Sequence, residues 1–188
     1  MSTYCEIAPG HEWHGPYHQG HYGFPIADDD QLFERLILEI NQAGLSWLTI
    51  LKRQDAFRKA FRDFQIDKVA RMSARDVERL MLDASIIRNR MKIEATIENA
   101  KRIRAIQRDQ GSFAVWLAAS HPLTKAEWVK LFKKNFVFTG GEIVGEFLMS
   151  IGYLPGAHHT GCPIHTKIAK LKPAWMQAER NGFDFSKV

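Results

Sequence analysis

The sequence predicts an all-α fold, and three observations support this prediction. Apolar side chains recur every three or four positions along most of the chain, which is the spacing of one helix face. Capping residues and glycines stand where such stretches begin and end. We find no alternating run of β-branched residues bounded by hairpin turns. With 188 residues and 45% hydrophobic content, the chain is long enough for one domain, or two small lobes, with a genuine core.

The expected elements begin at residue 28. Residues 1–27 are rich in glycine, histidine and aromatic residues without a helical period, so we expect an ordered loop only where other groups hold it. A helix starts at Asp28, because one of three consecutive aspartates can cap it and early acidic residues suit the helix dipole. Gly44 ends this helix, and Ser46 caps a second one that extends to about residue 52.

Eight further patterns predict the remaining helices. Ser73 and Asp76 are spaced as in a capping box, Gly111 stops the longest helix, and Pro173 suits a first helical turn. The expected ranges are 54–63, 67–72, 73–83, 89–109, 112–119, 124–135, 141–153 and 173–181. There is no internal repeat, and no linker is long enough to separate independent domains.

Composition indicates an ordinary globular protein in a reducing compartment. Charged residues make up 25% of the chain, and no apolar run approaches the roughly 20 residues of a membrane span. The N-terminus lacks the basic flank and apolar core of a signal peptide. We therefore expect a cytoplasmic location, no membrane partner, and two cysteines that act as thiolates rather than as a disulfide.

The chain carries an excess of positive charge, with a net charge of +5 and a pI of about 9.3. Such an excess favours an anionic partner, nucleic acid first among them. Seven basic residues lie between Arg88 and Arg108, and a second cluster contains Lys130, Lys133 and Lys134. Either cluster could also be a solvated helix face.

Both cysteines and seven of the eight histidines fall in two short stretches at opposite ends of the chain. Thiolate and imidazole are the preferred ligands of zinc, which takes four of them in a tetrahedron. The best candidates are Cys5, His18, His158 and Cys162, two from each end. Zinc there would close a second lobe, residues 1–27 plus 111–188, on a helical lobe of residues 28–110 within one compact unit. The alternative is two unpaired thiols among surface imidazoles, since the spacings are not those of common zinc fingers.

One carboxylate stands on the apolar side of the first long helix. Glu39 lies on the apolar stripe of this helix. A carboxylate there must either be paired with hydrogen-bond donors or lie in a pocket. Trp47 follows the turn after this helix and can swing its ring across the same pocket, which would suit a flat, cationic heterocycle. Tyr17, beside the proposed ligand His18, would be held by the metal. The alternative is that Glu39 pairs with Arg35 and that Trp47 belongs to the core.

Residues 73–108 form a helix, a short turn and a second helix. Such a hairpin exposes backbone N–H groups and a helix N-terminus, which both suit a DNA phosphate. Arg88, Arg90 and Lys92 come directly after the turn and agree with this use. An ordinary corner between two helices would have the same spacing.

Six motifs occur in order and together resemble one known family. They are Tyr17-His18-x4-Gly23-x-Pro25, Leu32-Phe33-Glu34, Gln42-Ala43-Gly44-Leu45-Ser46-Trp47, Ile86-Ile87-Arg88-Asn89-Arg90-x-Lys92-Ile93, Phe136-x-Phe138-x-Gly140 and His158-x3-Cys162. Over nearly its whole length the chain resembles 3-methyladenine DNA glycosylase I, a base-excision enzyme of the helix-hairpin-helix superfamily. The resemblance implies a helix-hairpin-helix bundle whose ends are joined by a structural zinc site.

The resemblance also implies the activity and the residues that carry it. A monomer would flip N3-methyladenine out of double-stranded DNA and excise it hydrolytically. Glu39 would be the catalytic residue that accepts hydrogen bonds from the base, Trp47 would stack on it, and Tyr17 and His14 would contact it. Zinc would bind Cys5, His18, His158 and Cys162. The hairpin would grip DNA through Ser85, Arg88, Arg90 and Lys92.

The chain departs from the family pattern along the expected pocket wall. Ile7, His14 and Tyr22 stand where the family often has other aromatic residues, residues 141–146 lack its usual Thr/Ser-rich sequence, and Ser85 replaces a common hairpin glycine. Two alternatives to an active glycosylase therefore stay open. One is a catalytically weak or inactive relative that binds damaged DNA. The other is a zinc-stabilised helical module whose partner is not a nucleic acid.

Overall fold

All regular secondary structure in residues 3–186, the part of the chain that the computed structural model describes, is helical. This confirms the predicted all-α class. The elements are α1 (Tyr4–Ile7), α2 (His14–Gly20), α3 (Asp29–Gln42), α4 (Trp47–Leu51), α5 (Gln54–Ala60), the 3₁₀ helix η1 (Arg62–Phe64), α6 (Ile66–Val69), α7 (Ala74–Met81), α8 (Arg90–Gln110), α9 (Phe113–Ser120), α10 (Lys125–Asn135), α11 (Gly141–Ser150), α12 (Pro163–Lys170) and α13 (Ala174–Arg180).

The predicted caps and stops position most helix ends. The Asp28 carboxylate accepts a hydrogen bond at the start of α3, the Ser46 hydroxyl does so for α4, and Ser73 opens α7 with a capping box. Gly44 and Gly111 end their helices with φ of +82° and +91°, a conformation that costs glycine little. Other observed ends lie one to three residues from the predicted ones.

Three helices were not predicted: α1, α2 and α12, which lie in the glycine-, proline- and histidine-rich ends of the chain. Helix α5 also stops at Ala60 instead of residue 63, because Arg62, Asp63 and Phe64 have φ of 57°, 56° and 52°. This left-handed turn brings Phe64 back into the core, where its ring stacks on that of Phe61 at 5.8 Å. Core packing therefore overrides the continuous helical pattern of this segment.

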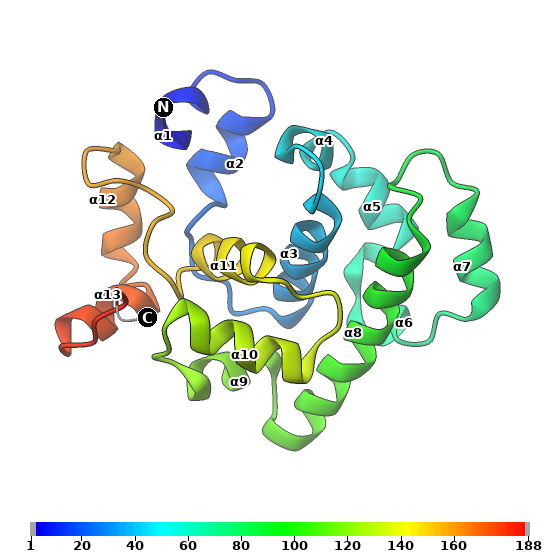
Figure 1. Ribbon diagram of the computed structural model, residues 1–188. Coiled ribbons are helices and arrows are strands. Elements are labelled where there is room, and N and C mark those ends of the chain that lie inside the picture. The colour runs from blue at the N-terminus through cyan, green and yellow to red at the C-terminus, as the bar shows by residue number, and fades with distance from the viewer. Residues whose placement is uncertain (1–2, 187–188) are drawn as a thin grey trace.

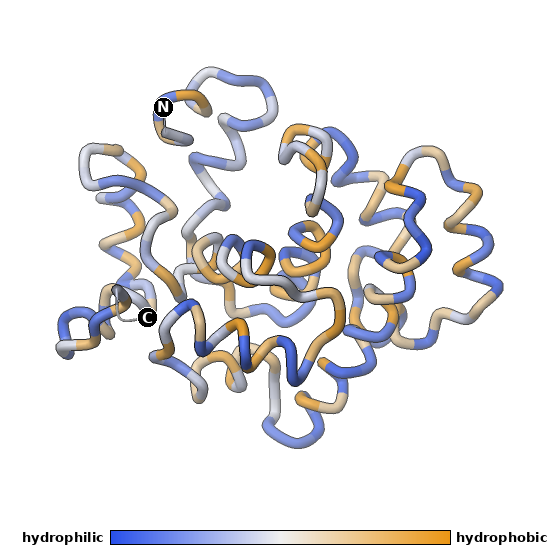
Figure 2. The backbone as a smooth tube through the Cα atoms, viewed as in Figure 1, coloured by the Kyte–Doolittle hydropathy of each residue, from blue (hydrophilic) through white to orange (hydrophobic). Residues whose placement is uncertain are grey.

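Helix α3 runs through the middle of the molecule and packs against α4, α8, α9 and α11 (Figure 1). Leucine and isoleucine residues, orange along the backbone tube in Figure 2, recur along α3, and their side chains are buried. Because the whole helix is enclosed, its polar residues Arg35, Glu39 and Asn41 are buried as well. The main apolar core extends from Leu32 to Leu154 and so crosses the lobe boundary expected at residue 110.

The N-terminal segment contacts the segment that contains α12. A small second core of Cys162, Ile164 and Ile168 packs against Cys5 and Phe24 (Figure 1). At Gly23, which has φ of +82°, a Cβ atom would lie 2.9 Å from the Ala157 Cβ, so only glycine fits here. Within residues 3–186, no helix combines the length and the apolar character needed to cross a lipid bilayer.

Candidate functional site

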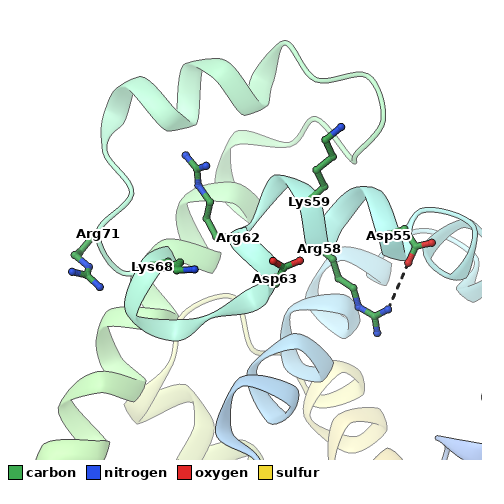
Figure 3. A pocket seen from close by; sticks show the side chains of 7 residues that line it. All are labelled: Asp55, Arg58, Lys59, Arg62, Asp63, Lys68 and Arg71. Carbon is green, nitrogen blue, oxygen red and sulfur yellow. Dashed lines mark ion pairs between the residues drawn. The ribbon is translucent and has the colours of Figure 1, made fainter.

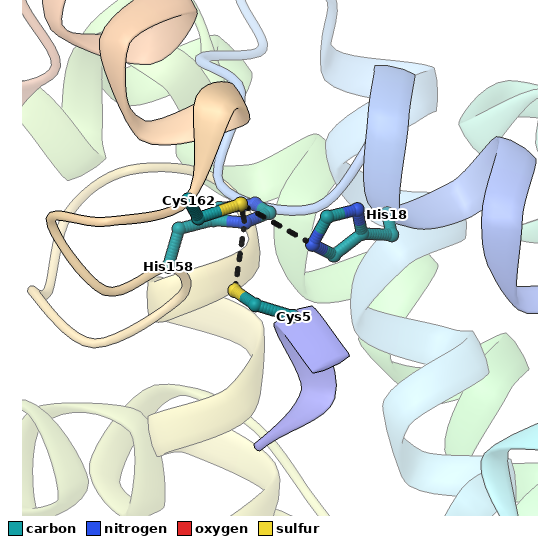
Figure 4. A group of neighbouring side chains, drawn as sticks. All are labelled: Cys5, His18, His158 and Cys162. Atoms are coloured by element: carbon teal, nitrogen blue, oxygen red, sulfur yellow. Dashed lines mark hydrogen bonds between the residues drawn. The ribbon is translucent and has the colours of Figure 1, made fainter. Parts of the chain in front are cut away.

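The four predicted metal ligands converge from both ends of the chain (Figure 4). Cys5 lies on α1 and His18 on α2, whereas His158 lies in the loop that leads to Cys162, the residue that caps α12. Their ligand atoms all lie within 4.8 Å of one another. A largely buried cluster that brings together three separate segments would not arise from scattered surface imidazoles.

The distances within this cluster fit a tetrahedral zinc ion. The Nδ1 atom of His158 lies 3.4 Å from the Cys5 sulfur and 3.6 Å from the Cys162 sulfur, and the His18 Nε2 atom lies 3.7 Å from the Cys162 sulfur. Zinc with bonds of about 2.3 Å to sulfur and 2.0–2.1 Å to nitrogen keeps such ligands about 3.5 Å apart. The other ring nitrogen of His158 donates to the Tyr22 carbonyl at 2.8 Å, which leaves Nδ1 free to bind metal.

Next to this cluster, a cavity of about 600 Å³ opens between α2, α3, α4 and α11. Its walls carry three carboxylates and four aromatic rings. The lining residues are Tyr4, Tyr17, Tyr22, Glu39, Gln42, Ala43, Gly44, Trp47, Glu142, Ile143 and Glu146, with no lysine, arginine or histidine among them. This chemistry favours a planar ligand with positive charge or hydrogen-bond donors.

Glu39 lines this cavity without a counter-ion. Its side chain is 4% exposed, and no hydrogen bond or ion pair reaches its carboxylate from residues 3–186. Arg35, the alternative partner, donates instead to the Tyr17 hydroxyl at 3.2 Å and the Ser150 carbonyl at 3.3 Å. Burial, and then the charge of Glu146, raises the pKa of Glu39 to about 8, although Arg35 opposes this shift.

The aromatic wall is built around Trp47. Its ring centroid lies 5.0 Å from that of Tyr17, and its buried indole N–H has no hydrogen-bond acceptor in the described residues. Burial raises the pKa values of Tyr4, Tyr17 and Tyr22, so these hydroxyls stay neutral donors. The structure thus brings Tyr17, Glu39 and Trp47 together as predicted.

The fourth predicted base contact, His14, does not line the cavity. Its Nδ1 atom hydrogen-bonds with the Tyr4 hydroxyl at 3.0 Å, so His14 lies behind Tyr4. Sequence reasoning missed Tyr4, although its neighbour Cys5 is a predicted ligand, and the same adjacency had pointed to Tyr17. It treated Tyr22 and residues 141–146 only as departures from the family pattern and gave neither Tyr22 nor Glu146 a contact with the base, and nothing in the expected helix 141–153 showed that Glu146 would face the cavity.

Comparisons with known proteins agree with this geometry. The sequence model described as methyladenine glycosylase matches residues 9–127. A DNA-3-methyladenine glycosylase of Haemophilus influenzae is 35% identical over 88% of this chain and 100% of its own length. DNA-3-methyladenine glycosylase 1 of Escherichia coli is 37% identical over 78% of this chain and 88% of its own length.

The chain belongs to the methyladenine glycosylase family.

Solved structures of family members share its fold. A variant of 3-methyladenine DNA glycosylase I in complex with 3-methyladenine has a TM-score of 0.78 and 33% identity, covering 87% of this chain and 97% of its own. The Staphylococcus aureus enzyme, solved to explain 3-methyladenine recognition, has a TM-score of 0.77 and 34% identity, covering 85% and 95%.

The helical hairpin of this methyladenine glycosylase family member is formed by α7, residues 82–89 and α8. The amides of Ile86, Ile87 and Arg88 donate no hydrogen bond to any residue in the range 3–186; Ile86 is buried, whereas Ile87 is half-buried and Arg88 exposed. Ser85 differs, because both its amide and its hydroxyl donate to the Asp83 carboxylate. Arg88 is exposed, while Arg90 is held by Glu78 through two contacts of 2.9 Å.

Lys92 has a different role from the one predicted. It is 5% exposed, and its ammonium group donates to the Asn41 carbonyl at 2.9 Å and the Ala43 carbonyl at 2.7 Å. These carbonyls belong to the end of α3, so Lys92 caps that helix with a positive charge. A phosphate contact needs an exposed ammonium group, so the predicted role of Lys92 in DNA binding does not fit the structure.

The structure also has a larger hollow of about 790 Å³, whose lining differs in chemistry from that of the aromatic cavity (Figure 3). Its lining is five basic and two acidic residues, Asp55, Arg58, Lys59, Arg62, Asp63, Lys68 and Arg71. No aromatic ring lines it, and its charge repels a cation. The smaller, acidic cavity is therefore the candidate site for a base.

Proposed function

We propose that this chain is a DNA repair glycosylase that excises N3-methyladenine from alkylated DNA. The observation that carries the proposal is the buried, unpaired Glu39 carboxylate in an aromatic cavity. Relatives named DNA-3-methyladenine glycosylase, and a similar structure in complex with 3-methyladenine, support this assignment.

The chemistry of the lesion matches what the cavity offers. Methylation at N3 leaves the base of the nucleotide cationic, so the bond to the sugar is already weak. That bond breaks with its electron pair going to the base, which departs neutral. Water then adds to the sugar carbon and loses a proton to solvent. The protein must select the base, stabilise the positively charged sugar and admit water, and it has no need to protonate the leaving group.

Each cavity residue has a distinct part in this scheme. Glu39 accepts hydrogen bonds from the base and favours its positive charge. Trp47 stacks on the base, and its free indole N–H, with the neutral Tyr17 hydroxyl, supplies donors at the wall. Such a stack contributes about 1–3 kcal/mol. Flipping places the base here while the hairpin amides and Arg88 hold the backbone of double-stranded DNA.

Zinc is the cofactor that fits the Cys5, His18, His158 and Cys162 cluster. Four protein ligands leave no open position for water, so the role we propose is structural. When bound, the ion would tie the two ends of the chain together beside the cavity. One chain supplies every group of cavity and cluster, which supports a monomer. A cytoplasmic location is part of the same proposal.

The decisive test is release of free bases from methylated duplex DNA, resolved by chromatography. We expect 3-methyladenine to be released by the parent protein and at a much lower rate by Glu39→Gln. Tight, salt-dependent binding of the DNA without release would instead identify an inactive damage-binding relative. If the protein neither binds DNA nor releases a base, the assignment is wrong.

A further inference from the structure

The base pocket contains more negative charge than recognition of one base requires. Glu39, Glu142 and Glu146 all line it, in a chain whose net charge is +5. One carboxylate balances one cationic base. The other two therefore need a separate explanation.

Glu142 is accounted for by its surroundings. Its side chain is 90% exposed and pairs with the Lys125 ammonium at 3.2 Å. Water and a neighbouring cation both stabilise this charge, so it places little demand on a ligand.

Glu146 has no such ion pair, although the charge of Lys125 still acts on it from a longer distance. It lies one turn further along α11, half-buried, and no ion pair reaches it from the described part of the chain. One carboxylate oxygen accepts a hydrogen bond from the Tyr22 hydroxyl at 3.1 Å. The other oxygen receives no hydrogen bond from residues 3–186, yet it is not sealed from the cavity. Burial raises the pKa of this carboxyl group and the charge of Glu142 adds to the shift, while the Tyr22 hydrogen bond and the charge of Lys125 oppose it.

The two carboxylates without an ion pair in the described residues approach the cavity from different walls. Glu39 stands on α3 and Glu146 on α11, and these helices pack against each other. The charge of Glu146 is felt at Glu39, whose pKa it raises. Two acceptors that repel each other across a cavity are stabilised together by a ligand that supplies N–H donors or positive charge to both.

Building on the function proposed above, we propose that Glu146, oriented by Tyr22, is a specificity-determining residue that reads a second edge of the base. Its free oxygen accepts an N–H bond from an amino-bearing cationic purine. If the base has a keto oxygen at the same edge, that oxygen and the free Glu146 oxygen are both acceptors and repel each other, so the pocket rejects the base. A site built to accept a donor discriminates strongly against ligands that lack it, because its own polar group is then left unpaired.

The test compares two free bases that differ at this edge, 3-methyladenine with an amino group and 7-methylguanine with a keto group. Dissociation constants are measured by calorimetry for the parent, Glu146→Gln and Tyr22→Phe. For Glu146→Gln we expect 3-methyladenine affinity to fall about tenfold and 7-methylguanine affinity to hold or rise, since an amide can donate to the keto oxygen. Tyr22→Phe keeps the charge but loses its orientation, so the same change in preference should be smaller.

A matched control is Glu179→Gln, which removes an exposed carboxylate from α13, and it should bind both bases as the parent does. The ratio of the two bases released from one preparation of methylated DNA gives a second readout. An equal loss for both bases would mean that Glu146 only positions Tyr22, and no change would mean that it takes no part in binding; either result would overturn the inference. Release of 3-methyladenine by the parent still supports the proposed function in that case, whereas a parent that binds neither base overturns both.

Discussion

Glu39 is buried without a counter-ion, so its ionisation carries a free-energy cost that a cationic ligand would remove. Its place on the apolar stripe of α3 predicted a satisfied carboxylate or a pocket, and the structure has the pocket. The sequence could not decide this, because Arg35 stands four residues away at the spacing of a helical ion pair. In the structure Arg35 turns towards Tyr17 and Ser150 instead.

Glu39→Gln should change the pH dependence of stability. A free glutamate titrates near 4.5, whereas the pKa of Glu39 in the folded protein is about 8. Between these values the folded state binds the extra proton, so the free energy of unfolding of the parent falls as pH rises through about 8. The cost approaches about 1.4 kcal/mol for each pKa unit of difference. Urea unfolding at pH 5, 7 and 9 should show that the free energy of unfolding falls less with rising pH in the variant than in the parent. An equal fall in both proteins would contradict this account.

Trp47→Ala should weaken binding of free 3-methyladenine by about 1–3 kcal/mol, the usual contribution of one base–aromatic stack. The fold should survive, because Trp47 lies at the edge of the core. Trp175→Ala removes an indole outside the cavity and serves as the control. Unchanged affinity in Trp47→Ala, measured by calorimetry, would show that the base is read elsewhere.

Lys92→Met tests the corrected role of this lysine. Loss of the ammonium leaves two carbonyls at the end of α3 without their donor, which should cost about 1.5–3 kcal/mol of stability. The salt dependence of DNA binding should stay at the parent value, since Lys92 is buried. Lys101→Met, which removes an exposed lysine of the same helix, should leave stability unchanged. A salt slope reduced by one unit in Lys92→Met would restore the original phosphate assignment.

At the scale of elements, the hairpin brings together two kinds of group that we propose for DNA contact. The Ile87 and Arg88 amides, which have no acceptor in residues 3–186, lie in its turn, and the side chain of Arg88 is exposed beside them. Arg90 is already engaged by Glu78, so its charge is partly neutralised before DNA arrives. The two arginines are therefore unequal, although their spacing made them equivalent candidates.

Arg88→Gln should weaken binding to all duplex sequences about equally and reduce the salt slope by about one unit. Arg108→Gln, at the far end of α8, provides a control of the same charge change. Binding isotherms at several salt concentrations give both slopes. If Arg88→Gln and Arg108→Gln behave alike, the hairpin is not the element that faces DNA.

At the scale of the molecule, the helical class and most boundaries followed from periodicity and capping alone. The ends of the chain did not, because α1, α2 and α12 are short and depend on contacts between residues about 150 positions apart, such as Cys5 with His158. The same applies to the cavity. Local pattern pointed to Tyr17, Glu39 and Trp47, whereas Tyr4, Tyr22 and Glu146 join them only through tertiary packing. The turn at residues 62–64 shows the reverse case, where burial of Phe64 breaks a good helical pattern.

Cys162→Ala should remove zinc and loosen both ends of the chain. Structural zinc sites in peptides are worth roughly 10–16 kcal/mol, but a separate helical core should limit the loss here to several kcal/mol. Elemental analysis should find one zinc per parent chain and less in the variant, and hydrogen exchange should rise at both termini. His159→Ala, which removes an exposed imidazole beside the cluster, should keep its metal. A parent purified without chelator that contains no zinc would refute the site.

Each tyrosine of the pocket wall is tied to the cluster of four Cys and His side chains proposed to bind zinc. Tyr4 precedes Cys5, Tyr17 precedes His18, and the Tyr22 carbonyl accepts a hydrogen bond from His158. Fixing a backbone residue costs about 1–2 kcal/mol of conformational entropy, and an ion bound during folding meets this cost before the base arrives. Chelation should therefore abolish base affinity at temperatures where the helical core stays folded. If zinc binds as proposed, affinity for the damaged base would therefore depend on the zinc supply, whereas the helical hairpin proposed to bind DNA lies outside the cluster.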